Sequence, residues 1–210
     1  MMRFVHTAVV ACALAVPAIG SAQTTAKPKP PARGAQSTHT KSSTAASGVA
    51  AADQAFAKAA AMGGMAEVDL GKLAAGNGSS ADVKQFGQRM VDDHGKGNDE
   101  LKSWAAQKGV TLPAALNAKH KAEHARLEKM TGSAFDRAYM AAMVADHNQD
   151  VAEFQRESKA AKDADLKAWA AKTLPTLQDH QKSAKEINAK VHGSAAKAPA
   201  AKKTTQKTGS

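Results

Sequence analysis

The chain has 210 residues, and its 29 Lys or Arg residues outnumber its 19 Asp or Glu residues, giving a formal net charge of +10. Its single cysteine excludes a disulfide framework, so the fold must be stable on packing alone or with a metal. Four basic residues and no acidic ones lie in each of the segments 23–48 and 193–210, which leaves segment 49–192 nearly neutral. Because a nucleic-acid-binding domain carries its basic patch on the fold, no specific nucleic-acid binding is expected.

The first 22 residues are typical of a secretory signal peptide. Arg3 precedes an apolar run over residues 8–19, and small residues surround a predicted cleavage after Ala22. The run is too short to span a bilayer, so no transmembrane helix is expected in the mature protein. Cys12 lies inside the run, which leaves the mature chain without cysteine. A lipoprotein cleavage box at Cys12 is the alternative, although the apolar run continues well past it.

Two basic low-complexity segments flank the body of the chain. Residues 23–48 are rich in Pro, Lys, Thr and Ser, and residues 193–210 are similar. Neither segment has apolar periodicity, so both are predicted to be disordered tails. Their charge has two interpretations: a soluble spacer, or an electrostatic tether to an anionic envelope surface.

Segment 49–192 is predicted to form one all-α domain. Its residues favour helix, and its turn signals predict helices over about 53–75, 80–109, 113–132, 134–162 and 163–192. Short turns make the first pair and the last pair of long helices antiparallel neighbours. The connection over 113–132 can cross the bundle, which predicts a ferritin-like four-helix bundle with a helical crossover between long helices two and three. A plain up-down bundle is the alternative.

One phrase occurs three times: Asp-His, then Glu six residues after the His, then an apolar residue seven after it. The copies are "DHGKGNDEL", "DHNQDVAEF" and "DHQKSAKEI", which contain His94, His147 and His180. A step of seven along a helix returns within roughly 20° of the same face. Each histidine therefore shares a stripe with an apolar residue and is predicted to lie in the core.

The three histidines also lie at matching depths. His147 and His180 are about sixteen residues either side of the turn between their helices, and His94 is about sixteen past its own turn. The first helix lacks the phrase, but Glu67 interrupts its apolar face about one helical turn from that depth. Each long helix is thus predicted to contribute one metal-capable side chain, Glu67, His94, His147 or His180, to one layer.

Three functions are compatible with this layer. Burying titratable groups costs several kcal/mol unless they are paired or bound to metal. Three His and one Glu suit a single Zn, Cu, Ni or Fe(II) ion. A hydrogen-bonded structural layer is the alternative, and a metal-dependent oxidase would need an open coordination position. No phosphate-binding Gly loop or paired nucleophile indicates an enzyme, so a non-enzymatic role is favoured.

Two further features lie beside the histidines. Gly95 and Gly97 follow His94 inside a predicted helix, where each costs up to ~1 kcal/mol relative to Ala. Pro175 precedes His180 and removes one helical hydrogen bond. Violations of local rules cluster at functional sites. Close helix packing and a harmless kink are the simpler explanations.

Five segments in order resemble the domain-of-unknown-function family 4142: "AEVDLGKLAA", "VKQFGQRMVDDH", "LPAAL", "FDRAYMAAMVADH" and "LKAWAAKTLPTLQDH". The resemblance covers about residues 51–191. It implies an exported bacterial protein of the periplasm or outer membrane with a ferritin-like bundle, and it implies little about activity.

The sequence departs from the di-iron pattern of such bundles. Di-iron sites use Glu three residues before His, where this chain has Val91, Val144 and Leu177. The leading hypothesis is therefore an exported, non-enzymatic bundle that binds one transition-metal ion and serves envelope homeostasis or stress tolerance. The sequence predicts no oligomeric state.

Overall fold

The computed structural model describes residues 48–196, with side chains described through residue 193. This stretch contains five helices and no strand, which confirms the all-α prediction for it. The helices are α1 (Ala51–Asn77), α2 (Ala81–Lys108), α3 (Ala118–Glu128), α4 (Gly132–Ala160) and α5 (Ala164–Ala196). The predicted signal peptide, the 23–47 part of the linker and residues 197–210 lie outside the described residues. Helix α5 ends at Ala196, three residues beyond the start of the tail predicted at residue 193. The tail boundary itself stays a prediction.

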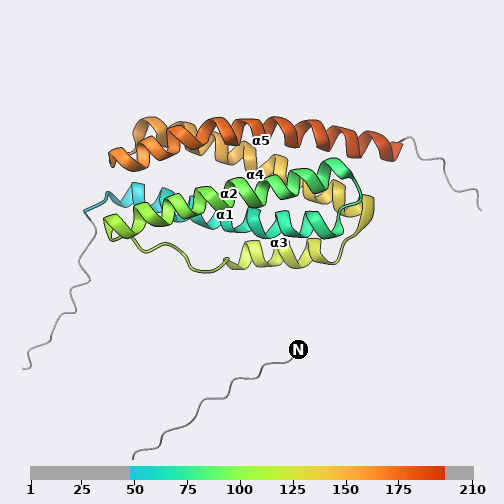
Figure 1. Cartoon of the computed structure of the whole chain (residues 1–210), viewed down its shortest axis with the longest axis horizontal. Helices are drawn as coiled ribbons and strands as arrows, with labels where there is room; N and C mark the ends of the chain where they lie inside the picture. Colours follow the sequence, from blue (N-terminus) through green and yellow to red (C-terminus); the bar gives the residue numbers. More distant parts are fainter. Residues whose placement is uncertain (1–47, 197–210) are drawn as a thin grey trace, which may run out of the picture. The chain divides into compact units, whose positions relative to one another are not determined.

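The direction of the chain gives the bundle its topology. Helices α1 and α2 form one antiparallel pair, and α4 and α5 form the other (Figure 1). Helix α3 runs back along the bundle, so α4 starts at the end where α2 starts and runs parallel to it (Figure 1). The predicted helical crossover between the second and third long helices is confirmed, and the up-down alternative is wrong.

Two apolar clusters fill the bundle, one on each side of the histidine layer. The first contains Phe56, Leu101, Trp104, Phe154, Leu166 and Leu177, among others. The second contains Leu70, Phe86, Met90, Tyr139, Met143 and Ala184, among others. Along each long helix, the residue of the predicted polar layer lies between a residue of one cluster and a residue of the other. The polar layer therefore lies between the two apolar clusters.

Helices α1 and α2 approach closely where two glycines face each other. A Cβ atom on Gly71 would lie 2.5 Å from the carbonyl oxygen of Gly87, and one on Gly87 would lie 2.5 Å from Cβ of Ala74. Neither position can hold a side chain unless the helices move apart. This contact is one helical turn from Glu67 on α1 and two turns from His94 on α2, so it helps to fix their separation.

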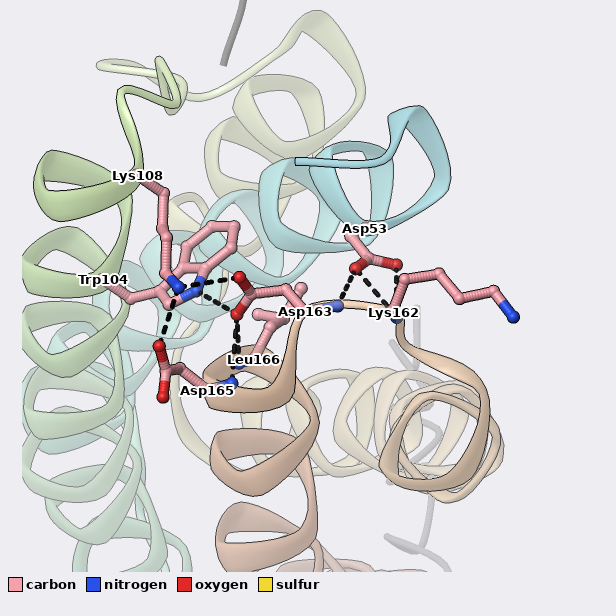
Figure 2. A network of polar contacts seen from close by, with 7 residues as sticks. All are labelled: Asp53, Trp104, Lys108, Lys162, Asp163, Asp165 and Leu166. Atoms are coloured by element: carbon pink, nitrogen blue, oxygen red, sulfur yellow. Dashed lines mark hydrogen bonds and ion pairs between the residues drawn. The ribbon is translucent and has the colours of Figure 1, made fainter. Parts of the chain in front are cut away.

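A polar network holds the turn between α4 and α5 (Figure 2). The Asp53 carboxylate on α1 accepts hydrogen bonds from the N–H groups of Lys162, at 2.9 Å, and Asp163, at 2.6 Å. Asp163 in turn caps the first turn of α5 and accepts a hydrogen bond from the Trp104 indole at 2.9 Å. Its second oxygen is 2.8 Å from the Lys108 ammonium of α2. The network joins the start of α1, the end of α2 and the start of α5.

The same device occurs at the opposite turn. Asp136 of α4 is 2% exposed and accepts hydrogen bonds from the N–H groups of Ser79 and Ser80, both at 2.9 Å. These residues immediately precede α2, so an acidic side chain of one helix caps the start of another.

No helix within residues 48–196 combines the length and the apolar character needed to cross a bilayer.

Candidate metal centre

Each of the four long helices contributes one side chain to a buried polar layer: Glu67 from α1, His94 from α2, His147 from α4 and His180 from α5. The His94 side chain is 11% exposed, and the other three are at most 3% exposed. One ring nitrogen of each histidine lies within 4.8 Å of the corresponding nitrogens of the other two. Ring centroids are 5.3 Å apart for two of the pairs and 5.7 Å apart for the third. The structure thus brings together all three histidines that the repeated phrase singled out.

In His147 and His180, a hydrogen bond made by one ring nitrogen fixes the tautomer of the ring. His147 Nδ1 lies 2.9 Å from the carbonyl oxygen of Met143, which can only accept, so Nδ1 carries the hydrogen. His180 Nε2 lies 2.8 Å from Asp93 Oδ2, an oxygen that also accepts a hydrogen bond from Arg89. Nε2 of His180 therefore donates. In both rings the other nitrogen keeps its lone pair.

Glu67 contacts the rings of His94 and His147. Its Oε2 lies 3.0 Å from His94 Nδ1, and its Oε1 lies 3.4 Å from His147 Nδ1. Burial raises the pKa of Glu67 well above 4.5, and the nearby acids Asp150 and Asp146 raise it further. The carboxyl group thus lies against the Nδ1 atoms of two rings, and its role as a fourth ligand stays a prediction.

Three ring nitrogens have no hydrogen-bond partner within the described part of the chain: Nε2 of His94, Nε2 of His147 and Nδ1 of His180. A buried polar atom left in this way costs about 1–3 kcal/mol. Metal-binding histidines show this arrangement, in which one nitrogen is bonded to a carboxylate or carbonyl and the other is directed at the ion. In each ring, one nitrogen contacts a protein group and the other has no partner within the described residues. The three nitrogens without partners have the chemistry of metal ligands.

The charge state of the rings also suits a metal. Burial lowers the pKa of His147 to about 4, with a further contribution from the neighbouring His180. Burial likewise lowers the pKa of His94 well below 6.5 and lowers that of His180. All three rings are neutral at pH 7, the form in which imidazole binds a metal ion.

The geometry is compatible with one ion. A tetrahedral ion with ~2.1 Å bonds to nitrogen separates its ligands by roughly 3.4 Å, so small ring rotations suffice within the 4.8 Å limit. Three protein nitrogens would leave the fourth position to Glu67 or to another ligand. The Glu that the di-iron pattern places three residues before a His is missing, because Val91, Val144 and Leu177 occupy those positions.

Sequence patterns did not indicate which groups accept hydrogen bonds from His147 Nδ1 and His180 Nε2. Asp93 precedes His94 in the repeated phrase, yet it binds His180 on a different helix. Met143 contributes a backbone carbonyl, which no side-chain pattern reveals. A histidine four residues after a core residue of the same helix is the only available signal for that contact.

Comparison with known proteins agrees with this fold. Residues 38–187 match the family described as "Domain of unknown function (DUF4142)". The chain belongs to this family. The resemblance that the five segments indicated is thereby confirmed, and the matched region of this DUF4142 chain includes all four residues of the polar layer.

The crystal structure of a DUF305 fragment from Deinococcus radiodurans is similar to the DUF4142 bundle. The TM-score is 0.60 at 12% sequence identity, and the alignment covers 68% of this chain and 98% of that one. At this identity the likeness shows a shared helical fold alone. Comparison with curated proteins finds no similar chain.

Proposed function

We propose that this protein binds a single divalent transition-metal ion through His94, His147 and His180. The observation that carries the proposal is the set of three buried ring nitrogens without a partner within residues 48–196, on rings whose nitrogens gather within 4.8 Å. Imidazole ligands suit Zn, Cu, Ni and Fe(II). When bound, the ion supplies positive charge that compensates the carboxylates around the layer.

Glu67 and Asp93 support the ligands in this proposal. Asp93 accepts the hydrogen of His180 Nε2, and Glu67 Oε2 lies 3.0 Å from His94 Nδ1. Both contacts help to fix the orientation of the ring that they touch. Glu67 Oε1 also lies 3.4 Å from His147 Nδ1, but the hydrogen on that nitrogen is donated to the Met143 carbonyl, which orients the His147 ring.

The proposed setting is the bacterial cell envelope. The signal-peptide pattern of residues 1–22 supports export, and the absence of cysteine after residue 12 is compatible with an oxidising compartment. In that setting the protein would serve metal homeostasis or stress tolerance without catalysing a reaction. A structural layer of hydrogen-bonded histidines is the competing interpretation.

Measuring metal content distinguishes a metal-binding protein from one with a structural layer of hydrogen-bonded histidines. The mature protein, purified without a His tag, is expected to bind one ion per chain, as measured by elemental analysis after loading and dialysis. His147→Ala and His180→Ala are each expected to abolish stoichiometric binding, because two imidazoles cannot complete the site. His192→Ala is the matched control, since His192 lies exposed on α5. The double variant should lose no more affinity than either single variant.

Thermal unfolding provides the second measurement. An ion at a hundred times its Kd should stabilise the wild-type protein by about 2.7 kcal/mol and leave His147→Ala unaffected. No bound metal, and no thermal shift with Zn, Cu, Ni, Fe or Mn, would contradict the proposal. A structural layer would instead show a loss of about 1–3 kcal/mol in each Ala variant and no response to metal.

A further inference from the structure

An acidic pocket of about 240 Å³ is lined by residues of α1, α3 and α4. Helix α4 contributes Asp146, Asp150 and Glu153 to its lining, and α1 contributes Glu67. The three histidines of the polar layer do not line it. The pocket therefore presents four carboxyl groups in a place separate from the ring nitrogens of the candidate metal centre.

The three acidic residues of α4 share one face of the helix. Asp146, Asp150 and Glu153 are spaced by four and then three residues, which makes them neighbours on the helix surface. Like charges at these spacings repel each other. Glu153 lies 3.6 Å from the Arg156 guanidinium, whereas Asp146 and Asp150 make no ion pair within the described residues. This face of α4 thus carries negative charge that ion pairs do not balance.

The positive groups of α3 compensate that charge incompletely. Lys119 and His120 line the pocket and lower the pKa of Asp146, yet burial raises it and the net shift is upward. Burial, together with the charges of Asp146 and Glu153, raises the pKa of Asp150 to about 7. A bound cation would supply the positive charge that this face of the pocket lacks.

One carboxylate oxygen at the pocket is buried without a hydrogen-bond partner. Glu67 is 2% exposed, and its Oε1 has no partner within the described residues. Oε1 faces α4, since it lies 3.4 Å from His147 Nδ1, a nitrogen that donates its hydrogen to the Met143 carbonyl. Buried acceptors are normally satisfied by a protein group, a water or a ligand. Oε1 is therefore an unused acceptor on the side of Glu67 that faces the acidic helix.

The spacing of the carboxylates indicates which kind of cation fits. Among the described residues, the three histidines are the group whose ligand atoms gather closely enough to hold an ion directly. The pocket carboxylates are farther apart, so they suit an ion that keeps its waters and is bound through them, as Mg²⁺ commonly is. Since one water needs roughly 10–15 Å³, the pocket has room for the roughly six waters of an octahedral ion.

We propose that this pocket binds a hydrated divalent cation of the Mg²⁺ type, held by Asp146, Asp150 and Glu153 through its waters. Glu67 Oε1 accepts a hydrogen bond from one of these waters. The cation is distinct from the ion proposed for the histidines, and the inference does not depend on that ion.

Titration of the metal-free protein with Mn²⁺ tests the inference, because the EPR signal of free Mn²⁺ decreases as the ion binds. Wild type is compared with His180→Ala, which removes one ring of the layer and no group of the pocket. Both are expected to bind Mn²⁺ in the pocket and to release it to Mg²⁺. Cobalt(III) hexaammine should also displace it, since this complex has the size of a hydrated ion and does not exchange its ligands for imidazole or carboxylate.

Two variants locate the bound ion. Asp150→Asn and Asp146→Asn each keep the shape of the side chain and remove one charge, and each should weaken Mn²⁺ binding by about ten-fold. Asp92→Asn is the matched control, because it removes an exposed carboxylate of α2 outside the pocket, and it should bind Mn²⁺ as wild type does. Thermal unfolding without metal checks that the variants fold.

The outcomes separate this inference from the histidine site. Mn²⁺ that binds equally to wild type and His180→Ala, and is displaced by cobalt(III) hexaammine, supports the pocket even if no ion binds at the histidines. Folded His180→Ala that binds no Mn²⁺ overturns the pocket and leaves the histidine site standing. Wild-type protein that loses no Mn²⁺ to the hexaammine complex overturns it as well. So do Asp150→Asn and Asp146→Asn if both bind Mn²⁺ as tightly as Asp92→Asn.

Discussion

At the three histidines, the protein satisfies one ring nitrogen and leaves the other without a partner in the described chain. Two of the supporting contacts cross between helices: Glu67 of α1 supports His94 of α2, and Asp93 of α2 supports His180 of α5. Such contacts fix the rings before any ion binds. A preorganised set loses little conformational freedom on binding, which favours high affinity.

Glu67→Gln tests whether this carboxylate supports the rings or binds the ion. As a supporting group, its loss should weaken metal binding by about 10- to 100-fold while one ion per chain remains at saturation. Competition with a chelator of known affinity measures the change. As a ligand, its loss should also remove one oxygen from the coordination shell seen by X-ray absorption.

The control for this experiment is Glu186→Gln. Glu186 is the exposed Glu that follows His180 in the repeated phrase, and its replacement should leave metal affinity unchanged. Equal affinities for wild type and Glu67→Gln would show that Glu67 neither supports nor binds.

Among the helices, the contact between α1 and α2 depends on glycine. Gly87→Ala should destabilise the fold by about 1–3 kcal/mol, because the new Cβ would lie 2.5 Å from Cβ of Ala74 and 2.8 Å from the Gly71 carbonyl oxygen. Gly95→Ala, where a Cβ meets nothing within 4 Å, should stabilise it by up to about 1 kcal/mol. Urea unfolding of the metal-free protein measures both. Changes of the same sign in the two variants would contradict the close approach.

The turn between α4 and α5 should make the free energy of unfolding decrease at low pH. Burial acts to raise the pKa of Asp163, but hydrogen bonds from Lys108 and Trp104 outweigh it and lower the pKa to about 2. The unfolded value is near 3.8, so the stabilisation is present above about pH 4 and is lost as the pH falls toward 2.

Asp163→Asn should therefore destabilise the protein by about 1–2 kcal/mol at pH 7, after allowance for solvent screening. Thermal unfolding at pH 7, 4 and 2.5 measures the difference between variant and wild type. The difference should shrink at the lowest pH. A difference that stays constant down to pH 2.5 would show that the carboxylate charge contributes nothing.

At the scale of the whole molecule, the helical bundle is expected to fold without the flanking segments. The two apolar clusters and both polar turn networks lie within residues 49–192. A protein trimmed to these residues should keep the helical signal and, within a few degrees, the melting temperature of the mature chain. A large drop in melting temperature would show that a flanking segment packs on the bundle.

The same trimmed protein tests the role of the basic flanks. If they tether the protein to an anionic surface, trimming should abolish salt-sensitive binding to vesicles that contain anionic lipid. Unchanged binding would assign the contact to the bundle.

The sequence by itself determined the helices, their inward faces and the depth of the three histidines. The seven-residue spacing within each phrase fixes an angle around one helix, and Met90, Met143, Leu101 and Phe154 are buried where that angle places them. The inward faces and the depths of the histidines are local properties, because they depend only on helix geometry and on distance from a turn.

Only the tertiary structure decided which groups meet across the helices. The long connection allowed two topologies, and the path of α3 selects the one with α2 parallel to α4 (Figure 1). The partners of Glu67, Asp93 and Asp136 lie on other helices, so they depend on interhelical rotations and separations, such as the approach at Gly71 and Gly87. A shift of one or two ångströms between helices breaks a hydrogen bond but leaves the apolar periodicity and the turn signals of each helix unchanged. The sequence therefore does not display which groups meet across helices.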